Sequence, residues 1–279
     1  MEDIVRRDNE LGSMRLAFVL IVVVVLVFVS LFWYKSSQPK PGEGQFDVKD
    51  TSNTTRRVDM KALADKLDPQ HPITVDKVKA AFKDLTGKEM AQDEANKIIP
   101  DHIKGKLDSK VTVIEYEDFA CVHCQAVHSY VDKIHQEYGD RVRFIYRNFS
   151  LSYPNSDTVL IAGETAAKLG GNQAFWKMHD LLFQNDMWVS YAVDSATRNK
   201  TLTDYAKQSG LDADKFNAEF VNAQTNGVKA KIERDCALGR RMGVNGTPSV
   251  YINGKKLDGA VKYETLKSAL DKVLLGLKK

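Results

Sequence analysis

The chain has 279 residues, of which 40 are Lys or Arg and 37 are Asp or Glu, so its formal net charge at pH 7 is +3. This near balance argues against a nucleic-acid-binding protein, because such proteins carry a clear basic excess. Beyond an apolar N-terminal segment, about 240 residues remain, enough for one large domain or for one domain with an insertion.

The apolar run from Leu16 to Tyr34 contains no charged residue. At a rise of about 1.5 Å per residue it matches the hydrocarbon thickness of a bilayer. A cleaved signal peptide has a shorter apolar region and ends in small residues, whereas this run ends in Leu31-Phe-Trp-Tyr34. The sequence therefore predicts an uncleaved transmembrane signal anchor over 16–34, with a buried core helix as the alternative.

The charges beside this run predict its orientation. Three arginines lie within residues 1–15, and only two lysines follow the run closely. The excess of positive charge marks the cytoplasmic side of a membrane helix. We therefore expect a cytoplasmic N-terminus over 1–15 and a single-pass protein of the cell membrane. Its C-terminal domain is then extracytoplasmic, where disulfides persist.

Residues 35–57 lack a hydrophobic period and contain Ser36-Ser-Gln-Pro-Lys-Pro-Gly-Glu-Gly44, which predicts a flexible linker. Helical patterns follow over 60–67, over 75–85 and over about 92–98. Thr74 is the expected N-cap of the second, and Gly87 its C′ residue. They predict a helical appendage over 58–100, whose role stays open between packing on the main domain, dimerisation and contact with a partner.

The next elements form a predicted βαβ unit, whose strands pair in parallel. Its strands are Val111–Tyr116 and Arg141–Arg147, and its helix is Val122–Tyr138. The apolar stripe of this helix places His128 and His135 on the solvent side. Helical patterns then fill the chain as far as Met242, with a break at Gly170-Gly171. A strand over 249–252, a turn at Asn253-Gly254, a strand over 255–258 and a helix over 263–277 complete the order.

Cys121-Val-His-Cys124 lies where the first strand of this unit meets the helix. Cys121 is then at a helix N-terminus, where unpaired backbone N–H groups and the helix dipole favour a thiolate. A dithiol pair in this context is typical of a thioredoxin-type redox motif. A zinc site or a structural clip has the same spacing, and His128 follows Cys124 at helical i, i+4 spacing. However, no second C-x-x-C follows.

The segments around this motif resemble DsbA-type thiol:disulfide oxidoreductases, and more closely the membrane-anchored bacterial versions. The resemblance rests on Asp101-His-Ile-Lys-Gly105, on the segment from Val111 to Cys124, on Phe175-Trp-Lys-Met-His-Asp-Leu-Leu-Phe183 and on the segment from Gly243 to Gly254. It implies a thioredoxin-like α/β fold over 101–279, with an inserted helical domain at about 154–239.

The resemblance also implies roles for individual residues. Cys121 is the expected exposed nucleophile and Cys124 the buried resolving thiol, and their redox-active disulfide acts without a cofactor or a metal. Thr247 and Pro248 occupy the loop whose cis-proline faces the two cysteines in this family. Glu115, six residues before Cys121, takes the place of a buried acid/base beneath the disulfide.

His123, between the two sulfurs, is expected to stabilise the Cys121 thiolate, which makes the disulfide a stronger oxidant. The sequence has Val122 where the family commonly has proline, so the motif leaves the redox poise open. Cys236 lies four residues after Ile232 on a helical face, which favours a buried and inert thiol over a redox partner of Cys124.

The expected function is that of a dithiol oxidase that introduces disulfides into exported, unfolded proteins. The resemblance implies a membrane quinone-linked reoxidase of the DsbB or VKOR kind as its partner. A disulfide reductase or isomerase of the same fold is the first alternative. The second is a redox-inactive binding module whose C-x-x-C is structural or holds zinc.

Overall fold

The computed structural model describes residues 44–153, 155–189 and 194–277. The predicted anchor over 16–34 and the predicted cytoplasmic segment over 1–15 lie outside these residues. Within the described ranges, no helix is long and apolar enough to cross a membrane. All described residues belong to one compact unit of the chain.

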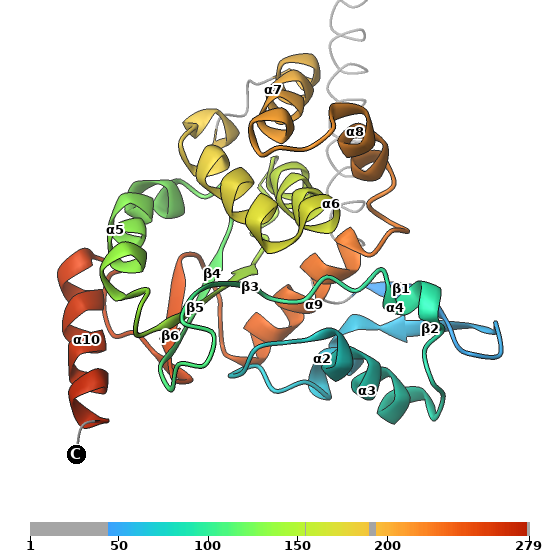
Figure 1. The fold of residues 1–279 in the computed structure, drawn as a ribbon, viewed down its shortest axis with the longest axis horizontal. Coiled ribbons are helices and arrows are strands. Elements are labelled where there is room, and N and C mark those ends of the chain that lie inside the picture. Colours follow the sequence, from blue (N-terminus) through green and yellow to red (C-terminus); the bar gives the residue numbers. More distant parts are fainter. Residues whose placement is uncertain (1–43, 154, 190–193, 278–279) are drawn as a thin grey trace, which may run out of the picture. The chain divides into compact units, whose positions relative to one another are not determined.

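A five-stranded mixed sheet in the order β3-β5-β4-β6-β7 lies at the centre of this unit (Figure 1). Its strands are β3 (His102–Gly105), β4 (Thr112–Glu117), β5 (Arg143–Asn148), β6 (Ser249–Ile252) and β7 (Lys255–Lys256). Only β4 and β5 pair in parallel, because α5 (Val122–Tyr138) connects them. The predicted βαβ unit and closing hairpin are confirmed, whereas β3 was not predicted.

Helices cover both faces of the sheet. Alternation along β4 sends Val113 toward α5 and α10 (Tyr263–Gly276), where it joins a buried cluster with Ile134 and Leu266. The other face of the sheet meets α9 (Val228–Arg241). A Cβ atom on Gly239 of α9 would lie 2.7 Å from the Phe149 ring, so only glycine allows this close approach.

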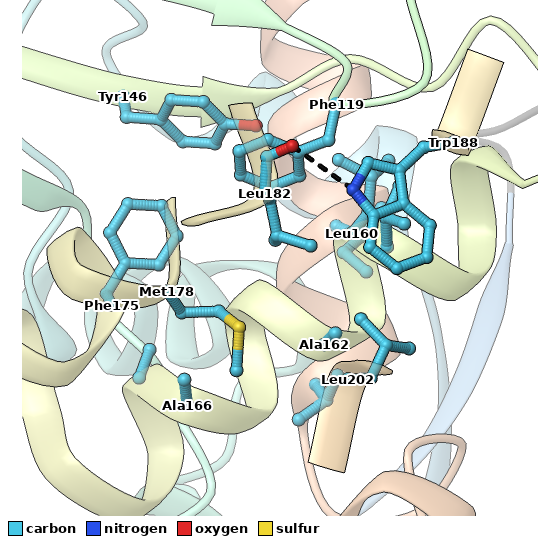
Figure 2. Close-up of a cluster of buried hydrophobic side chains, with 14 of the residues drawn as sticks. Phe119, Tyr146, Leu160, Ala162, Ala166, Phe175, Met178, Leu182, Trp188 and Leu202 are labelled. Carbon is cyan, nitrogen blue, oxygen red and sulfur yellow. Dashed lines mark hydrogen bonds between the residues drawn. The ribbon is translucent and has the colours of Figure 1, made fainter. Parts of the chain in front are cut away.

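The helical insertion comprises α6 (Ser156–Phe183), the 3-10 helix η1 (Asp186–Val189), α7 (Ser195–Gln208) and α8 (Ala213–Val221), and α9 then returns to the sheet. Its core packs around Phe175, Met178, Leu182 and Trp188, and the Trp188 indole N–H donates to the Leu182 carbonyl at 3.1 Å (Figure 2). Gly171 has φ 65° and ψ −160° inside α6, which confirms the predicted break. The thioredoxin-like fold with a helical insertion is therefore confirmed.

The linker prediction is wrong over the residues that form a β-hairpin, β1 (Gln45–Lys49) and β2 (Thr55–Asp59). The Asp50 carboxylate closes its turn by accepting hydrogen bonds from the backbone N–H groups of Ser52 and Thr54, at 2.9 and 3.0 Å. The apolar side chains of the hairpin pack on the helices that follow it. Each strand has only five residues, too few for a clear alternation in the sequence.

The appendage continues with α2 (Met60–Asp65), α3 (Val75–Thr86) and α4 (Gln92–Ala95). The predicted caps of α3 are confirmed, because the Thr74 side chain accepts from Lys77 N and Gly87 is left-handed. Ala237 and Leu238 of α9 belong to the same buried cluster as α2 and α3. Of the roles left open by the sequence, the structure therefore shows packing on the main domain.

Candidate active site

The turn between β4 and α5 positions the two cysteines. Asp118 fixes this turn, because its carboxylate accepts from Ala120 N at 2.9 Å, from Leu151 N at 3.0 Å and from the Ser156 hydroxyl at 2.6 Å. Burial is the largest influence on this carboxyl and raises the pKa of Asp118 to about 6, although these hydrogen bonds oppose the shift. Sequence reasoning missed Asp118, and the only signal was its place beside a second acid directly before the motif.

Cys121 is the N-cap residue of α5, and its sulfur lies 3.5 Å from the carbonyl oxygen of Thr247. The Thr247–Pro248 peptide bond is cis, as the resemblance implies. The structure therefore brings Cys121, Thr247 and Pro248 together. All three cysteines are free thiols in this structure.

The exposed position expected for Cys121 is wrong in this structure, because the residue is only 1% exposed. The Thr247 carbonyl lies against its sulfur, and Cys121 belongs to the buried cluster of the helical insertion. The neighbouring Val122 is 54% exposed instead. Cys124 is fully buried, as expected.

The two thiols have opposite proton affinities. A hydrogen bond from the Cys124 thiol and the backbone N–H groups of Cys124 and His123 lower the pKa of Cys121 to about 5, although burial opposes this shift. Burial raises the pKa of Cys124 well above that of an ordinary thiol. Cys121 is therefore a thiolate at neutral pH, and Cys124 keeps its proton.

His123 lies in the first turn of α5, and its side chain is exposed. The backbone N–H group of this residue supports the Cys121 thiolate. A stabilising role for the imidazole stays a prediction.

Glu115 is buried, as predicted, but its carboxylate is paired. His135 Nε2 lies 3.0 and 3.1 Å from the two carboxylate oxygens of Glu115. The solvent-facing position predicted for His135 is wrong, since β4 approaches α5 on that side and buries the imidazole. His128 is half-buried and stacks on Phe183, so it does not face solvent fully either.

Glu117 was not singled out from the sequence, and it is a buried acid that interacts with both Cys121 and Cys124. It lies two residues beyond Glu115 on the same face of β4 and is 2% exposed. Burial, the nearby Glu115 and Cys121 together raise the pKa of Glu117 well above the usual range of a carboxyl. The acidic pair formed with Asp118, just before Cys121, was the available signal in the sequence.

Cys236 lies on α9 and is 1% exposed. Its sulfur accepts a hydrogen bond from Ser150 N at 3.4 Å, and burial strongly raises the pKa of its thiol. This position fits the predicted inert thiol. Among the described residues, no group of three or more His, Cys, Asp or Glu side chains is placed to hold a metal ion.

Known proteins share this fold and part of this sequence. The chain is similar to BdbD from Bacillus subtilis in its oxidised form, with a TM-score of 0.53 and 24% identity over 62% of this chain and 91% of that one. It is also similar to the thiol-disulfide exchange protein α-DsbA2 from Wolbachia pipientis, with a TM-score of 0.52 and 20% identity over 61% and 86% of the two chains.

A curated relative is named Na(+)/H(+) antiporter NhaA 3, from Salinispora tropica, and is 31% identical over 61% of this chain. The chain spans about a quarter of the length of the curated relatives it matches. The sequence model of the thioredoxin family matches residues 97–272, which is more than half of the chain. The chain therefore belongs to the thioredoxin family.

Proposed function

We propose that this protein is a thiol:disulfide oxidoreductase that acts as a dithiol oxidase on exported proteins. One observation carries the proposal: Cys121 is the N-cap of α5 against the cis Thr247–Pro248 bond, and Cys124 lies buried one turn further. A low-pKa thiolate paired with a protonated resolving thiol is the arrangement that thiol-disulfide exchange requires.

The reaction begins when a substrate thiolate attacks Cys121 Sγ in the oxidised protein. The Cys121–Cys124 bond breaks, a mixed disulfide forms at Cys121, and the electron pair stays on the Cys124 sulfur, which takes up a proton. A second substrate thiolate then attacks the substrate sulfur of the mixed disulfide, and Cys121 leaves as a thiolate. The substrate is oxidised by two electrons and the protein becomes a dithiol.

The stability of the Cys121 thiolate sets the direction of this exchange. A stabilised thiolate favours the reduced protein, and the disulfide is then a stronger oxidant. The pKa of about 5 for Cys121 therefore supports the oxidase over a reductase or isomerase of the same fold. Similarity to the Wolbachia thiol-disulfide exchange protein supports the reaction class.

The proposal includes the membrane. An anchor over 16–34 would hold the domain outside the cytoplasm, and a membrane quinone-linked reoxidase would restore the disulfide. The uncharged run and the antiporter names of the curated relatives support a membrane location. The antiporter activity itself is not proposed for this chain, which matches only about a quarter of those proteins.

A trapping experiment tests the exchange reaction. In Cys124→Ala, the Cys121 thiolate attacks a peptide disulfide, one peptide sulfur leaves as a thiolate, and the other stays bonded to Cys121. Cys124 can no longer release it, so mixed disulfides should accumulate and disappear on reduction. Cys121→Ala is the matched control and should trap nothing. Equal trapping by both variants, or none by Cys124→Ala against a peptide disulfide, would contradict the proposal and favour the redox-inactive binding module.

A further inference from the structure

Glu117 stands out among the buried groups near the cysteines, because one of its carboxylate oxygens has no hydrogen-bond partner among the described residues. Burying a carboxylate oxygen without a hydrogen-bond partner costs free energy, and the cost is smaller when the carboxyl group keeps its proton. Such an oxygen in a folded protein needs an explanation, and a catalytic role is one. The carboxylates of Glu115 and Asp118, on either side of it, have their hydrogen bonds.

The strand geometry directs Glu117 toward the first turn of α5. Val113 and Glu115, on the same face of β4, meet the later turns of this helix, at Ile134 and His135. The helix runs back against the strand, because it connects two parallel strands. Each step toward the end of β4 is thus a step toward the start of α5. Glu117 is the last residue of the strand, and Cys124 lies in that first turn.

Tyr146 on β5 lies on the same side of the sheet. Its Cα is the register partner of Glu115, and its ring stacks on Phe119 with 5.4 Å between the centroids (Figure 2). The Tyr146 hydroxyl is buried and also lacks a hydrogen-bond partner among the described residues. Glu117 interacts electrostatically with four ionisable groups, which are Glu115, Cys121, Cys124 and Tyr146.

We infer that Glu117, and not Glu115, is the group that exchanges the proton of Cys124 during disulfide opening and closing. Glu115 is held by His135, whereas Glu117 interacts with both cysteines and has a carboxylate oxygen without a partner among the described residues. The inference rests on the proposed function and assigns one of its proton transfers. A buried acid whose oxygens are all hydrogen-bonded ordinarily stabilises the fold. Glu117 differs, because one of its oxygens has no partner among the described residues.

Opening of the disulfide consumes one proton at Cys124. The substrate thiolate bonds to Cys121 Sγ, the disulfide bond breaks, and the electron pair remains on Cys124 Sγ. The Glu117 carboxyl gives its proton to this sulfur and becomes a carboxylate. On closing, the Glu117 carboxylate takes the proton back from the Cys124 thiol, and the resulting thiolate attacks the sulfur of Cys121 in the mixed disulfide. Burial and the nearby Glu115 raise the pKa of Glu117, which keeps it protonated before the attack.

The test is the rate at which glutathione reduces the oxidised full chain, measured against pH and divided by the glutathione thiolate concentration. In the wild type this corrected rate should fall as Glu117 loses its proton. Glu117→Gln should lower the rate about tenfold or more at the acidic end and remove the pH dependence, because an amide gives no proton. Glu115→Gln is the matched control and should keep the pH dependence.

Glu117→Asp retains a carboxyl and should retain the pH dependence at a lower rate. This variant can also be measured if Glu117→Gln does not fold. The inference is overturned if Glu117→Gln keeps the wild-type profile, or if Glu115→Gln removes the pH dependence. A wild-type disulfide that does not react with glutathione at any pH would instead contradict the proposed function itself.

Discussion

Cys121 and Cys124 differ in proton affinity although one helical turn separates them. A hydrogen bond from the Cys124 thiol and backbone N–H groups in the first turn of α5 support the Cys121 thiolate, whereas Cys124 lies fully within the buried cluster. We predict that thiolate absorbance of the reduced protein titrates with a midpoint near pH 5. A midpoint near the free-thiol value of about 8.5 would contradict this electrostatic arrangement of the site.

The same pKa predicts how stability depends on pH. The folded pKa of about 5 for Cys121 is below the value of about 8.5 in the unfolded chain. The thiolate therefore stabilises the reduced protein fully above about pH 8.5, and this stabilisation is lost as pH falls toward about 5. Denaturant unfolding at several pH values should show it in the reduced protein. Cys121→Ser and the oxidised protein should both lack it.

The His123 side chain can be separated from its backbone by mutation. His123→Ser removes the imidazole but keeps the backbone N–H group that supports the Cys121 thiolate. The thiolate midpoint should therefore rise but stay below that of a free thiol, and each unit of the rise corresponds to about 1.4 kcal/mol. An unchanged midpoint would assign the whole effect to the backbone and remove the side chain from the site.

The sequence could identify Cys121 and Cys124, because a C-x-x-C motif between a strand and a helix is a local pattern. It could not assign the acid. The helical period of α5 predicted a solvent-facing His135. Only the folded structure, in which β4 packs against α5, shows that the His135 imidazole pairs with the Glu115 carboxylate. Glu117 is distinguished from Glu115 by an oxygen that has no partner in the described part of the chain, a property of the packed structure that no spacing in the sequence encodes.

At the scale of elements, the helices were predicted well because their caps and apolar periods are local signals. Thr74 and Gly87 bound α3, and a left-handed Gly171 breaks α6. The hairpin of β1 and β2 and the edge strand β3 were missed, because their short strands are defined by pairing with distant or neighbouring segments. The predicted parallel pairing of β4 with β5 does not determine which strands lie on either side of this pair, or in which direction they run.

The buried guanidinium of Arg147 connects the appendage to the sheet through hydrogen bonds. Arg147 of β5 is fully buried and donates to the Pro69 carbonyl at 2.6 Å, to the His71 carbonyl at 2.9 Å and to the Asp101 carboxylate at 2.8 Å. Asp101 in turn accepts from Ile73 N at 2.9 Å. One side chain of the sheet thus binds two carbonyl groups of the loop between α2 and α3.

Arg147→Met should therefore lower the free energy of unfolding by about 3–5 kcal/mol, because the buried Asp101 carboxylate would lose its nearest cationic partner and the two loop carbonyls would lose their donor. Denaturant unfolding measures this loss. Arg57→Met is the matched control, because Arg57 makes an exposed ion pair with Asp47 in the hairpin, and it should cost no more than about 1 kcal/mol. Equal losses in the two variants would contradict the role of Arg147.

At the scale of the whole molecule, the proposed anchor would hold the thioredoxin-like unit outside the cytoplasm. A reporter that is active only outside the cytoplasm should therefore work when it is fused after Lys279. Activity of only a cytoplasm-dependent reporter at the same position would reverse the orientation and remove the exported substrates from the proposal.

The oxidising direction of the Cys121–Cys124 pair is the central claim, and its reduction potential is the measurement that tests it most directly. Equilibration of the full chain with glutathione buffers of known potential should give a value between roughly −120 and −200 mV, the range of disulfide-donating enzymes. Cys236→Ala should give the same value, because the Cys236 sulfur accepts a hydrogen bond from Ser150 N and burial strongly raises the pKa of its thiol. A potential near the −270 mV or so of thioredoxin would contradict the oxidase and favour the reductase.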